Sequence, residues 1–240
     1  MNQRKSSTPA KSFTVKVAGK SLTYTWRQRP LLSSMLTALM SVFMGSNAYA
    51  LDVNALPTGG VVQGGDAAGT ITNTSISSQR IDQFQNSIIV DFTTFNIGSS
   101  ARVDVLQPGA TSVGLFRVTG SESSSIYGSL TANGQIFLVN NSGILFGRGA
   151  SINVGGLVAS TLSISDADFK SGKYVFTNNG NAGNIINRGT IVSGYTALLA
   201  PQVINEGLIA ARTSVVLAAG NKITLDMLGE GLIGVMVDAA

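Results

Sequence analysis

The sequence predicts an all-β fold, a solenoid of the parallel β-helix kind, and three observations lead to this prediction. Residues 128–162 are short β-branched and aromatic stretches that Gly or Asn interrupts every few positions, which indicates repeated tight corners between strands. Residues 186–191, INRGTI, recur as residues 204–209, INEGLI, 18 positions later. The Leu-Ala pairs at 199–200 and 217–218 keep the same spacing. Units of this kind cannot bury their own apolar face, so they stack into a solenoid.

This spacing also predicts which side chains stack inside the coil. We expect Asn187 and Asn205 to align at one corner and Arg188 to face outward. The predicted inward residues are Ile186, Ile191, Leu199, Ile204, Ile209 and Leu217.

A β-sandwich or β-barrel is the competing interpretation, because these folds also have many short strands separated by turn signals. A sandwich predicts Asn-Gly hairpins between alternating strands, and Asn133-Gly134 comes nearest to that pattern without matching it. The fixed spacing therefore favours the coil.

Residues 1–50 predict an extended secretory signal peptide. A basic segment without acidic residues leads to Arg27 and Arg29, then to the mostly apolar stretch 31–43, and ends in Ala48-Tyr49-Ala50. A small-x-small site after a short apolar region is what signal peptidase cleaves, so we expect export by the Sec machinery and cleavage between Ala50 and Leu51. The apolar stretch is shorter than the roughly 20 residues of a membrane span.

Removal of this leader changes the electrostatic character of the chain. Residues 1–50 contain 7 of the 16 Lys and Arg and none of the 12 Asp and Glu, so the net charge falls from +4 to −3. Nucleic-acid binding is excluded as a function, because the basic residues that it requires are lost at cleavage. Residues 51–240 fit one domain with a sizeable core and contain no Cys.

Two departures from the repeat are expected within this domain. Residues 51–60, LDVNALPTGG, combine an apolar start with Pro and a Gly pair, and we interpret them as a cap that covers the strand edges of the first coil. Residues 163–176, SISDADFKSGKYVF, are more charged and lack the Asn-x-Gly corner. They predict an insertion that protrudes from the solenoid, a turn or helix after Asp166 followed by a strand, with the coil resuming near Asn184.

Little in the sequence points to catalysis or to a cofactor. The chain has no His and no Cys, which excludes His-assisted serine catalysis, thiol catalysis and most zinc sites. Asp166 and Asp168 form one close carboxylate pair, which could serve polysaccharide cleavage or calcium binding, but Asp after Ser favours a local helix cap. We expect no enzyme activity, no metal and no cofactor.

Two further patterns have a structural and a functional interpretation. Gly147-Arg148-Gly149 and Gly155-Gly156 are Gly-rich, but no Lys-Ser or Lys-Thr follows, so corners explain them better than a phosphate loop. Phe92, Phe95 and Phe116 could form a ligand-binding aromatic surface, yet Phe has no polar edge and is more often core.

Several motifs resemble the N-terminal secretion domain of two-partner secretion exoproteins, of the filamentous haemagglutinin and contact-dependent toxin type. They are NALPTGG at 54–60, FNIG at 95–98, RVTG at 117–120, IYGSLTANG at 126–134 and VGGLVASTL at 154–162. The resemblance covers nearly all of residues 51–225 and includes the long basic leader.

The resemblance implies a right-handed, single-stranded β-helix of the pectin-lyase-like kind, recognised through the periplasmic POTRA domains of an Omp85-type outer-membrane transporter. The domain would act as a secretion address and folding seed, and the product would reach the cell surface or the medium of a Gram-negative cell through the periplasm. In the family, a motif Asn-Pro-Asn-Gly-Ile follows the Phe-Leu-Val strand. Here the corresponding residues are Asn140, Asn141, Ser142, Gly143 and Ile144, so the family's dependence on this loop carries over to Asn140, Gly143 and Ile144.

The same resemblance marks the cap residues Asn54, Leu56, Pro57, Gly59 and Gly60 as a family motif. Two other functions compete with the secretion address: a free-standing surface adhesin that binds host-cell or glycan ligands, and a polysaccharide-cleaving enzyme. The effector or adhesin region that normally follows such a domain is not identified by these residues.

The leader gives a first testable prediction. The secreted protein should begin at Leu51, because Ala48 and Ala50 are the small residues that signal peptidase accepts. N-terminal sequencing of the secreted product measures this directly. A product that retains Trp26 would contradict the prediction.

Overall fold

The computed structural model describes residues 11–17, 20–26, 50–180, 182–227 and 233–238. The chain divides into two units, residues 1–50 and residues 51–240. In the first unit, β1 (Lys11–Val17) and β2 (Lys20–Trp26) pair as an antiparallel hairpin. The apolar stretch 31–43 lies outside the described residues. Among the helices of the described ranges, none is long and apolar enough to cross a membrane.

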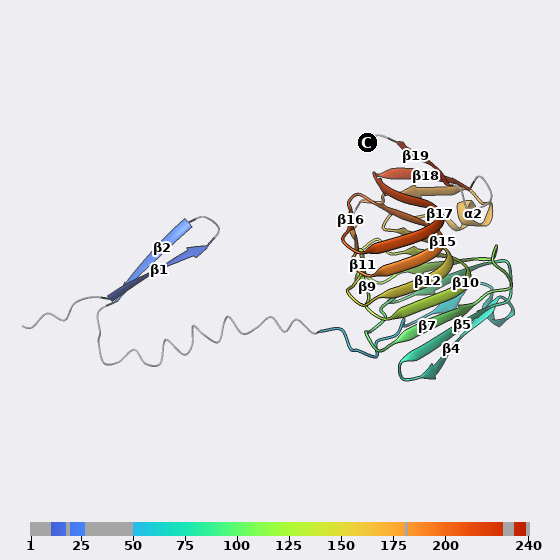
Figure 1. Cartoon of the computed structure of the whole chain (residues 1–240), viewed down its shortest axis with the longest axis horizontal. Coiled ribbons are helices and arrows are strands. Elements are labelled where there is room, and N and C mark those ends of the chain that lie inside the picture. Colours follow the sequence, from blue (N-terminus) through green and yellow to red (C-terminus); the bar gives the residue numbers. More distant parts are fainter. Residues whose placement is uncertain (1–10, 18–19, 27–49, 181, 228–232, 239–240) are drawn as a thin grey trace, which may run out of the picture. The chain divides into compact units, whose positions relative to one another are not determined.

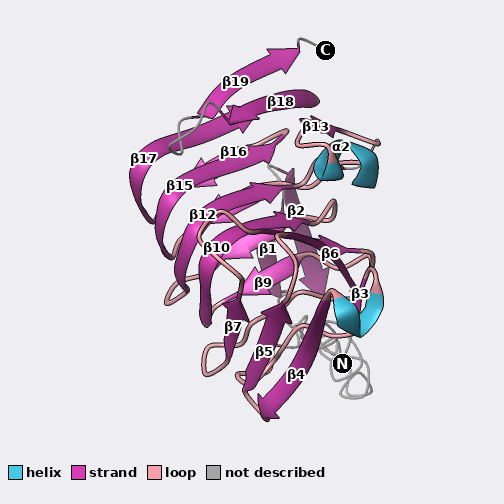
Figure 2. Cartoon of the chain, turned by 90° about the vertical axis from the view of Figure 1, so that its right-hand side faces the viewer, coloured by secondary structure: helices cyan, strands magenta, loops and turns pink. Residues whose placement is uncertain are grey.

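The second unit is a right-handed parallel β-helix, which confirms the predicted fold (Figure 1). Successive coils contribute the parallel strands of one long sheet, stacked as nearly parallel arrows in Figure 2. These strands are β5 (Ser78–Gln83), β7 (Arg102–Leu106), β10 (Ser129–Val139), β12 (Ser151–Ser160), β15 (Thr190–Ala200) and β17 (Leu208–Ala219). A four-stranded sheet forms another side of the coil, with β9 (Ser124–Ile126), β11 (Ile144–Phe146), β14 (Ile185–Asn187) and β16 (Val203–Asn205).

The long sheet branches at its N-terminal end. The first half of β10 pairs with β7, and its second half pairs with β8 (Val113–Val118), which in turn pairs with β6 (Ser87–Phe92). Antiparallel pairing occurs at this end, where β3 (Val61–Val62) joins β6 and β4 (Gly69–Ser75) joins β5, with the short 3-10 helix η1 (Gly65–Ala67) between them. Antiparallel strands break the coil pattern, so they end the parallel stack.

Two apolar cores lie on opposite faces of the same strands. Alternate residues of a strand point to opposite faces, so Ile136 and Leu138 of β10 face the inside of the coil while Phe137 and Val139 face outward. We call the cluster inside the coil the inner core and the cluster on its outer face the outer core. The outer core contains Ile89, Leu115, Phe137, Val139, Val158, Leu162, Ile164, Phe169, Phe176, Tyr195, Ala197, Leu199, Ala218, Ile223 and Leu225.

The predicted insertion covers this outer core. It contains α2 (Asp166–Lys170) and β13 (Tyr174–Thr177), as expected from the sequence, and the coil resumes with β14. Strand β13 pairs antiparallel with β18 (Lys222–Met227), and β18 pairs with β19 (Ile233–Asp238). Phe169 and Phe176 are buried in the outer core. The insertion thus lies outside the coil, but it packs on it as a layer instead of protruding as the sequence predicted.

An ion-pair cluster joins the insertion to the coil. Arg117 of β8 contacts Asp91 of β6 through Nε at 2.7 Å and Asp166 of α2 through Nη1 at 2.6 Å. Gln63 donates from Nε2 to the second oxygen of Asp91 at 2.7 Å. The hydrogen bond with Asp91, helped by Asp166, raises the pKa of Arg117 above its ordinary value. The guanidinium therefore stays charged and holds α2 against two strands.

The register between the last two coils corrects part of the predicted stacking. Ile191 and Ile209 pair and face the inner core as expected, and Asn187 pairs with Asn205. At the preceding corner, however, Ile185 and Val203 face inward, whereas Ile186 and Ile204 lie on the opposite, outer face of their strands. The prediction for those two isoleucines was wrong, because the inward positions at this corner are those of Asn187 and of Ile185, two residues earlier.

The spacing changes within the long strands. Strand β17 has one extra residue opposite Gly194, so Tyr195 pairs with Ser214 and the 18-residue spacing becomes 19. Leu199 consequently pairs with Ala218 and lies in the outer core, while Leu217 pairs with Leu198 and is 48% exposed. The predicted inward stack of Leu199 on Leu217 was wrong because of this bulge.

The Asn-x-Gly corners depend on close approach of the backbone. A Cβ on Gly207 would lie 2.3 Å from the carbonyl oxygen of Gly189 in the coil below. The Asn187 side chain donates to Asn205 Oδ1 at 2.7 Å and accepts from the amide of Gly189 at 3.1 Å. Stacked Asn side chains thus hold the corner, and Gly is needed because nothing larger fits between the coils.

The three phenylalanines are confirmed as core. Phe92, Phe95 and Phe116 are at most 1% exposed. The ring of Phe92 packs edge-on against both of the others, with centroids 5.2 and 5.7 Å apart. This geometry stabilises the first coils and leaves no ring surface for a ligand.

Two neighbouring residues of β15 test the register. Ile191→Ala should lower the free energy of unfolding by about 2–5 kcal/mol, because it empties a fully buried position of the inner core. Val192→Ala, at an exposed position on the other face, and Arg188→Ala should each change it by no more than about 0.5 kcal/mol. Urea unfolding of the purified protein measures all three, and equal losses at 191 and 192 would contradict the register.

Candidate functional site

The loop at residues 140–144 lies at the corner where the chain leaves β10 and enters β11. It closes as a turn in which the Gly143 amide donates to the Asn140 carbonyl at 3.1 Å. The coil below is tied to it by the Ser124 amide, which donates to the Gly143 carbonyl at 3.0 Å, and the next corner by the Ile144 amide, which donates to the Asn184 carbonyl at 3.1 Å. The loop is therefore one level of a stacked corner.

Asn140 is buried and forms three side-chain hydrogen bonds. Its Nδ2 donates to the Glu122 carbonyl at 3.0 Å and to Ser124 Oγ at 2.9 Å, and its Oδ1 accepts from the Ser142 amide at 2.9 Å. The residue is 1% exposed. In the folded domain Asn140 thus shapes the loop from within and presents no surface to a partner.

The other loop residues have distinct roles. Asn141 donates from Nδ2 to the Thr161 carbonyl and to Ser163 Oγ, both at 2.9 Å, and so joins the loop to the start of the insertion. Gly143 has a φ of +122°, a conformation that L side chains rarely adopt, and Ile144 packs in the inner core. Ser142 is the exposed tip. Around it lie the exposed Glu122 and Ser123 of the coil below and Asn184 of the corner above.

The cap motif is a separate, structural assembly. The Thr58 amide donates to the Thr94 carbonyl at 3.0 Å, and the Thr93 amide donates to the Thr58 carbonyl at 2.9 Å. Pro57 is buried, and its carbonyl accepts from Gln79 Nε2 at 3.0 Å. Gly59 has a φ of +64°, and a Cβ there would collide with Thr93.

The remaining cap residues fit the same assembly. Leu56 packs against the inner core, Asn54 donates its amide to the Asp52 side chain at 2.9 Å, and a Cβ on Gly60 would lie 2.8 Å from the Phe92 ring. Thus the residues predicted from the cap motif and those of the 140–144 loop form two sites with different partners. Of the cleavage residues, Ala50 is exposed and Leu51 half-buried, and Ala48 lies outside the described residues.

The carboxylate pair of the insertion has local partners. Ser165 caps α2, accepting from the Asp168 amide at 3.0 Å and donating to Asp168 Oδ2 at 2.7 Å. Asp166 is bound by Arg117. In the described part of the chain no three carboxylates cluster as a metal site would require. The helix cap, formed by Ser165, accounts for Asp168, and the ion pair with Arg117 accounts for Asp166.

A buried amide network was missed by the sequence reasoning. Gln107 donates from Nε2 to Gln83 Oε1 at 2.9 Å and accepts at Oε1 from the Gly134 amide at 2.9 Å. One coil further, Tyr195 donates to Gln135 Oε1 at 2.6 Å. Burial raises the pKa of Tyr195, so its hydroxyl remains a donor at any ordinary pH. The recurrence of Gln at 83, 107 and 135, about one coil apart, is the signal that could have revealed it.

Comparison with known proteins adds independent evidence on the family of this chain. Residues 53–232 match the family model described as the TPS secretion domain. A heme/hemopexin-binding protein of Haemophilus influenzae strain Rd is 35% identical over 185 residues, which are 72% of this chain and 20% of that protein. A second heme/hemopexin-binding protein of Haemophilus influenzae is 37% identical over 108 residues, 45% of this chain and 12% of that protein.

A solved structure agrees with the fold. The HMW1 secretion domain from Haemophilus influenzae superposes with a TM-score of 0.67 at 31% identity, covering 77% of this chain and 50% of that one. In the two heme/hemopexin-binding proteins, the region matched by this chain makes up a fifth or less of the full length.

The burial of Asn140 gives a prediction about stability, for which a variant of Ser142 is the control. Asn140→Ala should lower the free energy of unfolding by about 2–3 kcal/mol, because it leaves a part-buried carbonyl and a buried hydroxyl without their donor. Ser142→Ala, at the exposed tip, should change it by no more than about 0.5 kcal/mol. Urea unfolding decides, and an unchanged midpoint for Asn140→Ala would show that its hydrogen bonds are dispensable.

Proposed function

Because the chain belongs to the TPS secretion domain family, we propose that residues 51–240 form the secretion address and folding seed of a two-partner secretion exoprotein. Its partner would be the cognate Omp85-type outer-membrane transporter, which recognises the domain through periplasmic POTRA domains and passes it to the cell surface or medium. The observation that carries the proposal is the family match over residues 53–232. The predicted signal peptide supports export to the periplasm by the Sec machinery.

The connectivity of the β-helix supports the folding-seed role. Strands β10, β12, β15 and β17 each pair in parallel with the strand of the preceding coil, so each coil can use the coil before it in the chain as a template. Folding on the far side of the membrane would then bias transport outward without ATP. The absence of Cys from the chain suits a polypeptide that crosses the outer membrane unfolded.

The corner around Ser142 supports the address role in a specific form. Asn140 and Ile144 are buried after folding, whereas Ser142 stays exposed beside Glu122, Ser123 and Asn184. A transporter that reads Asn140 directly must therefore do so before the loop folds. A transporter that reads the folded domain must use the Ser142 tip, with Asn140 acting as a positioning residue.

The relatives in Haemophilus influenzae are named heme/hemopexin-binding proteins, but the matched region is a fifth or less of their length. This chain has neither His nor Cys, two of the residues that most often ligate haem iron.

Secretion from a Gram-negative host tests the proposal. With the cognate transporter co-expressed, the wild-type chain should appear in the medium or on the surface; without the transporter it should remain in the periplasm. Ser142→Trp should reduce the secreted fraction at least about fivefold, equivalent to about 1 kcal/mol of lost recognition, while leaving the urea midpoint unchanged. Arg148→Trp, at another exposed corner, is the matched control.

The outcomes separate the two parts of the proposal. Transporter-independent release of the wild type would contradict the secretion-address function. Normal secretion of Ser142→Trp with transporter-dependent wild type would contradict recognition at this tip. Binding of purified POTRA domains to urea-unfolded but not to folded wild type would show that the loop is read before it folds.

A further inference from the structure

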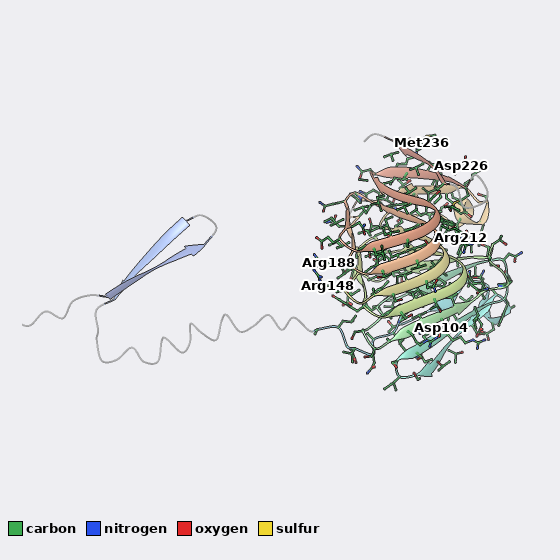
Figure 3. All side chains as sticks on the ribbon, viewed as in Figure 1. Asp104, Arg148, Arg188, Arg212, Asp226 and Met236 are labelled. Carbon is green, nitrogen blue, oxygen red and sulfur yellow. The ribbon has the colours of Figure 1, made fainter. Side chains whose placement is uncertain are left out.

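A cavity of about 500 Å³ lies on the exposed outer face of the long sheet. Four neighbouring strands, β5, β7, β10 and β12, line it, and the lining residues that determine its chemistry are Arg80, Arg102, Asp104, Leu106, Thr131 and Asn153. Figure 3 shows Asp104 on the sheet face toward the viewer, whereas Arg148 and Arg188 lie at the corner on the left. The cavity is of the size that small-molecule sites occupy, and it belongs neither to the cap nor to the 140–144 loop.

The bend of β10 places this cavity. The register of β10 shifts between Ala132 and Gln135. There Asn133 accepts from the Gln107 amide at 2.7 Å and donates to its carbonyl at 2.8 Å, which replaces the missing strand pairing. In the half of each strand that precedes the bend, the outer face of the sheet is uncovered. In the half that follows the bend, the insertion covers the outer core. The cavity therefore lies on the only half of these strands' outer face that the described layer leaves open.

Its charged groups are held in place before any ligand arrives. Arg80 donates from Nε to both oxygens of Asp82 at 2.8 and 2.9 Å. Arg102 donates from Nε and Nη2 to the two oxygens of Asp104 at 2.8 and 2.7 Å, and Thr131 Oγ1 adds a bond to Asp104 at 2.7 Å. The hydrogen bond from Arg102, with that from Thr131, lowers the pKa of Asp104. Preorganised groups of this kind lose little entropy on binding.

Hydrogen-bonding capacity remains free at the cavity. The side chains of Arg80 and Arg102 are 50% and 59% exposed, and Nη1 of each has no acceptor among the described residues. The side-chain amide of Asn153, exposed on β12, has no hydrogen-bond partner in the same described part of the chain. Leu106 is 43% exposed and provides an apolar surface beside these donors and acceptors.

The balance of charges selects the ligand class. Each guanidinium is paired with a carboxylate, Arg80 with Asp82 and Arg102 with Asp104. Asp104 lines the cavity together with both arginines, so an anion would meet Asp104 and a cation would meet Arg80 and Arg102. A neutral ligand with several hydroxyls satisfies both kinds of group, since each hydroxyl donates and accepts. The C–H face of a sugar ring suits the exposed Leu106. We propose that this outer-face cavity binds a neutral saccharide, a function beyond the secretion address and independent of it.

Titration of the purified full chain with lactose, maltotriose and diacetylchitobiose, followed by NMR, tests the proposal. At least one sugar should bind with a Kd on the order of 1 mM and shift the amide signals of β7 and β12. Asn153→Ala and Arg80→Ala should each weaken that binding about fivefold, the equivalent of one hydrogen bond, without changing the urea midpoint. Arg148→Ala, an exposed arginine away from the cavity, should bind as the wild type does.

Three results would overturn the proposal. They are no binding of any of the three sugars up to about 10 mM, unchanged binding by Asn153→Ala and Arg80→Ala, and tighter binding of inorganic phosphate at the same amides. The last would identify an anion site instead. None of them bears on secretion, which is measured with the transporter.

Discussion

In-register parallel pairing between successive coils is the constraint on which the rest of this structure depends. A strand in a solenoid has no partner of its own coil, so its backbone groups are satisfied only by the coils before and after it. The close approach that this requires fixes the small residues: a Cβ on Gly155 would lie 2.7 Å from the Gly134 carbonyl oxygen, and one on Gly194 2.3 Å from that of Gly155. These glycines mark the bend in β10, β12 and β15. The bend separates a half whose outer face is open from a half whose outer face is buried.

The buried half explains why the domain needs residues far beyond the coil that they stabilise. Phe137 and Val139 are outward side chains of β10, yet they are fully buried, because the insertion and β18 cover them. Strand β13 receives its pairing partner from β18, some 45 residues later in the chain. The outer core is therefore completed only after the last long strand, β17, has formed. Arg117 fixes the other side of the same layer to the first coils.

Burial also limits how the 140–144 loop would act as the proposed secretion address. A residue that a transporter must contact and a residue that the fold must bury are compatible only if the two events are separated in time. The side chain of Asn140 forms its hydrogen bonds inside the corner, so folding makes this residue inaccessible to a partner. Recognition of an unfolded loop followed by its burial would make release from the transporter a consequence of folding. The Ser142 tip is the part of the loop that remains available in either state.

The sequence by itself determined the class of fold, because Gly and Asn at fixed spacing and β-branched strands are local signals. It also located the insertion, the three core phenylalanines and the Asn187–Asn205 corner, each of which depends on composition within a short window. Tertiary structure decided the facing of Ile185 over Ile186, the shift of register at Gly194 and the burial of Leu199. A single bulge residue moves every later side chain to a different partner, and a covering layer supplied from distant residues turns an outward face into a core. Neither the bulge nor the covering layer changes the local pattern of residue types in the sequence. For the same reason, the burial of Asn140 could be known only from the folded chain.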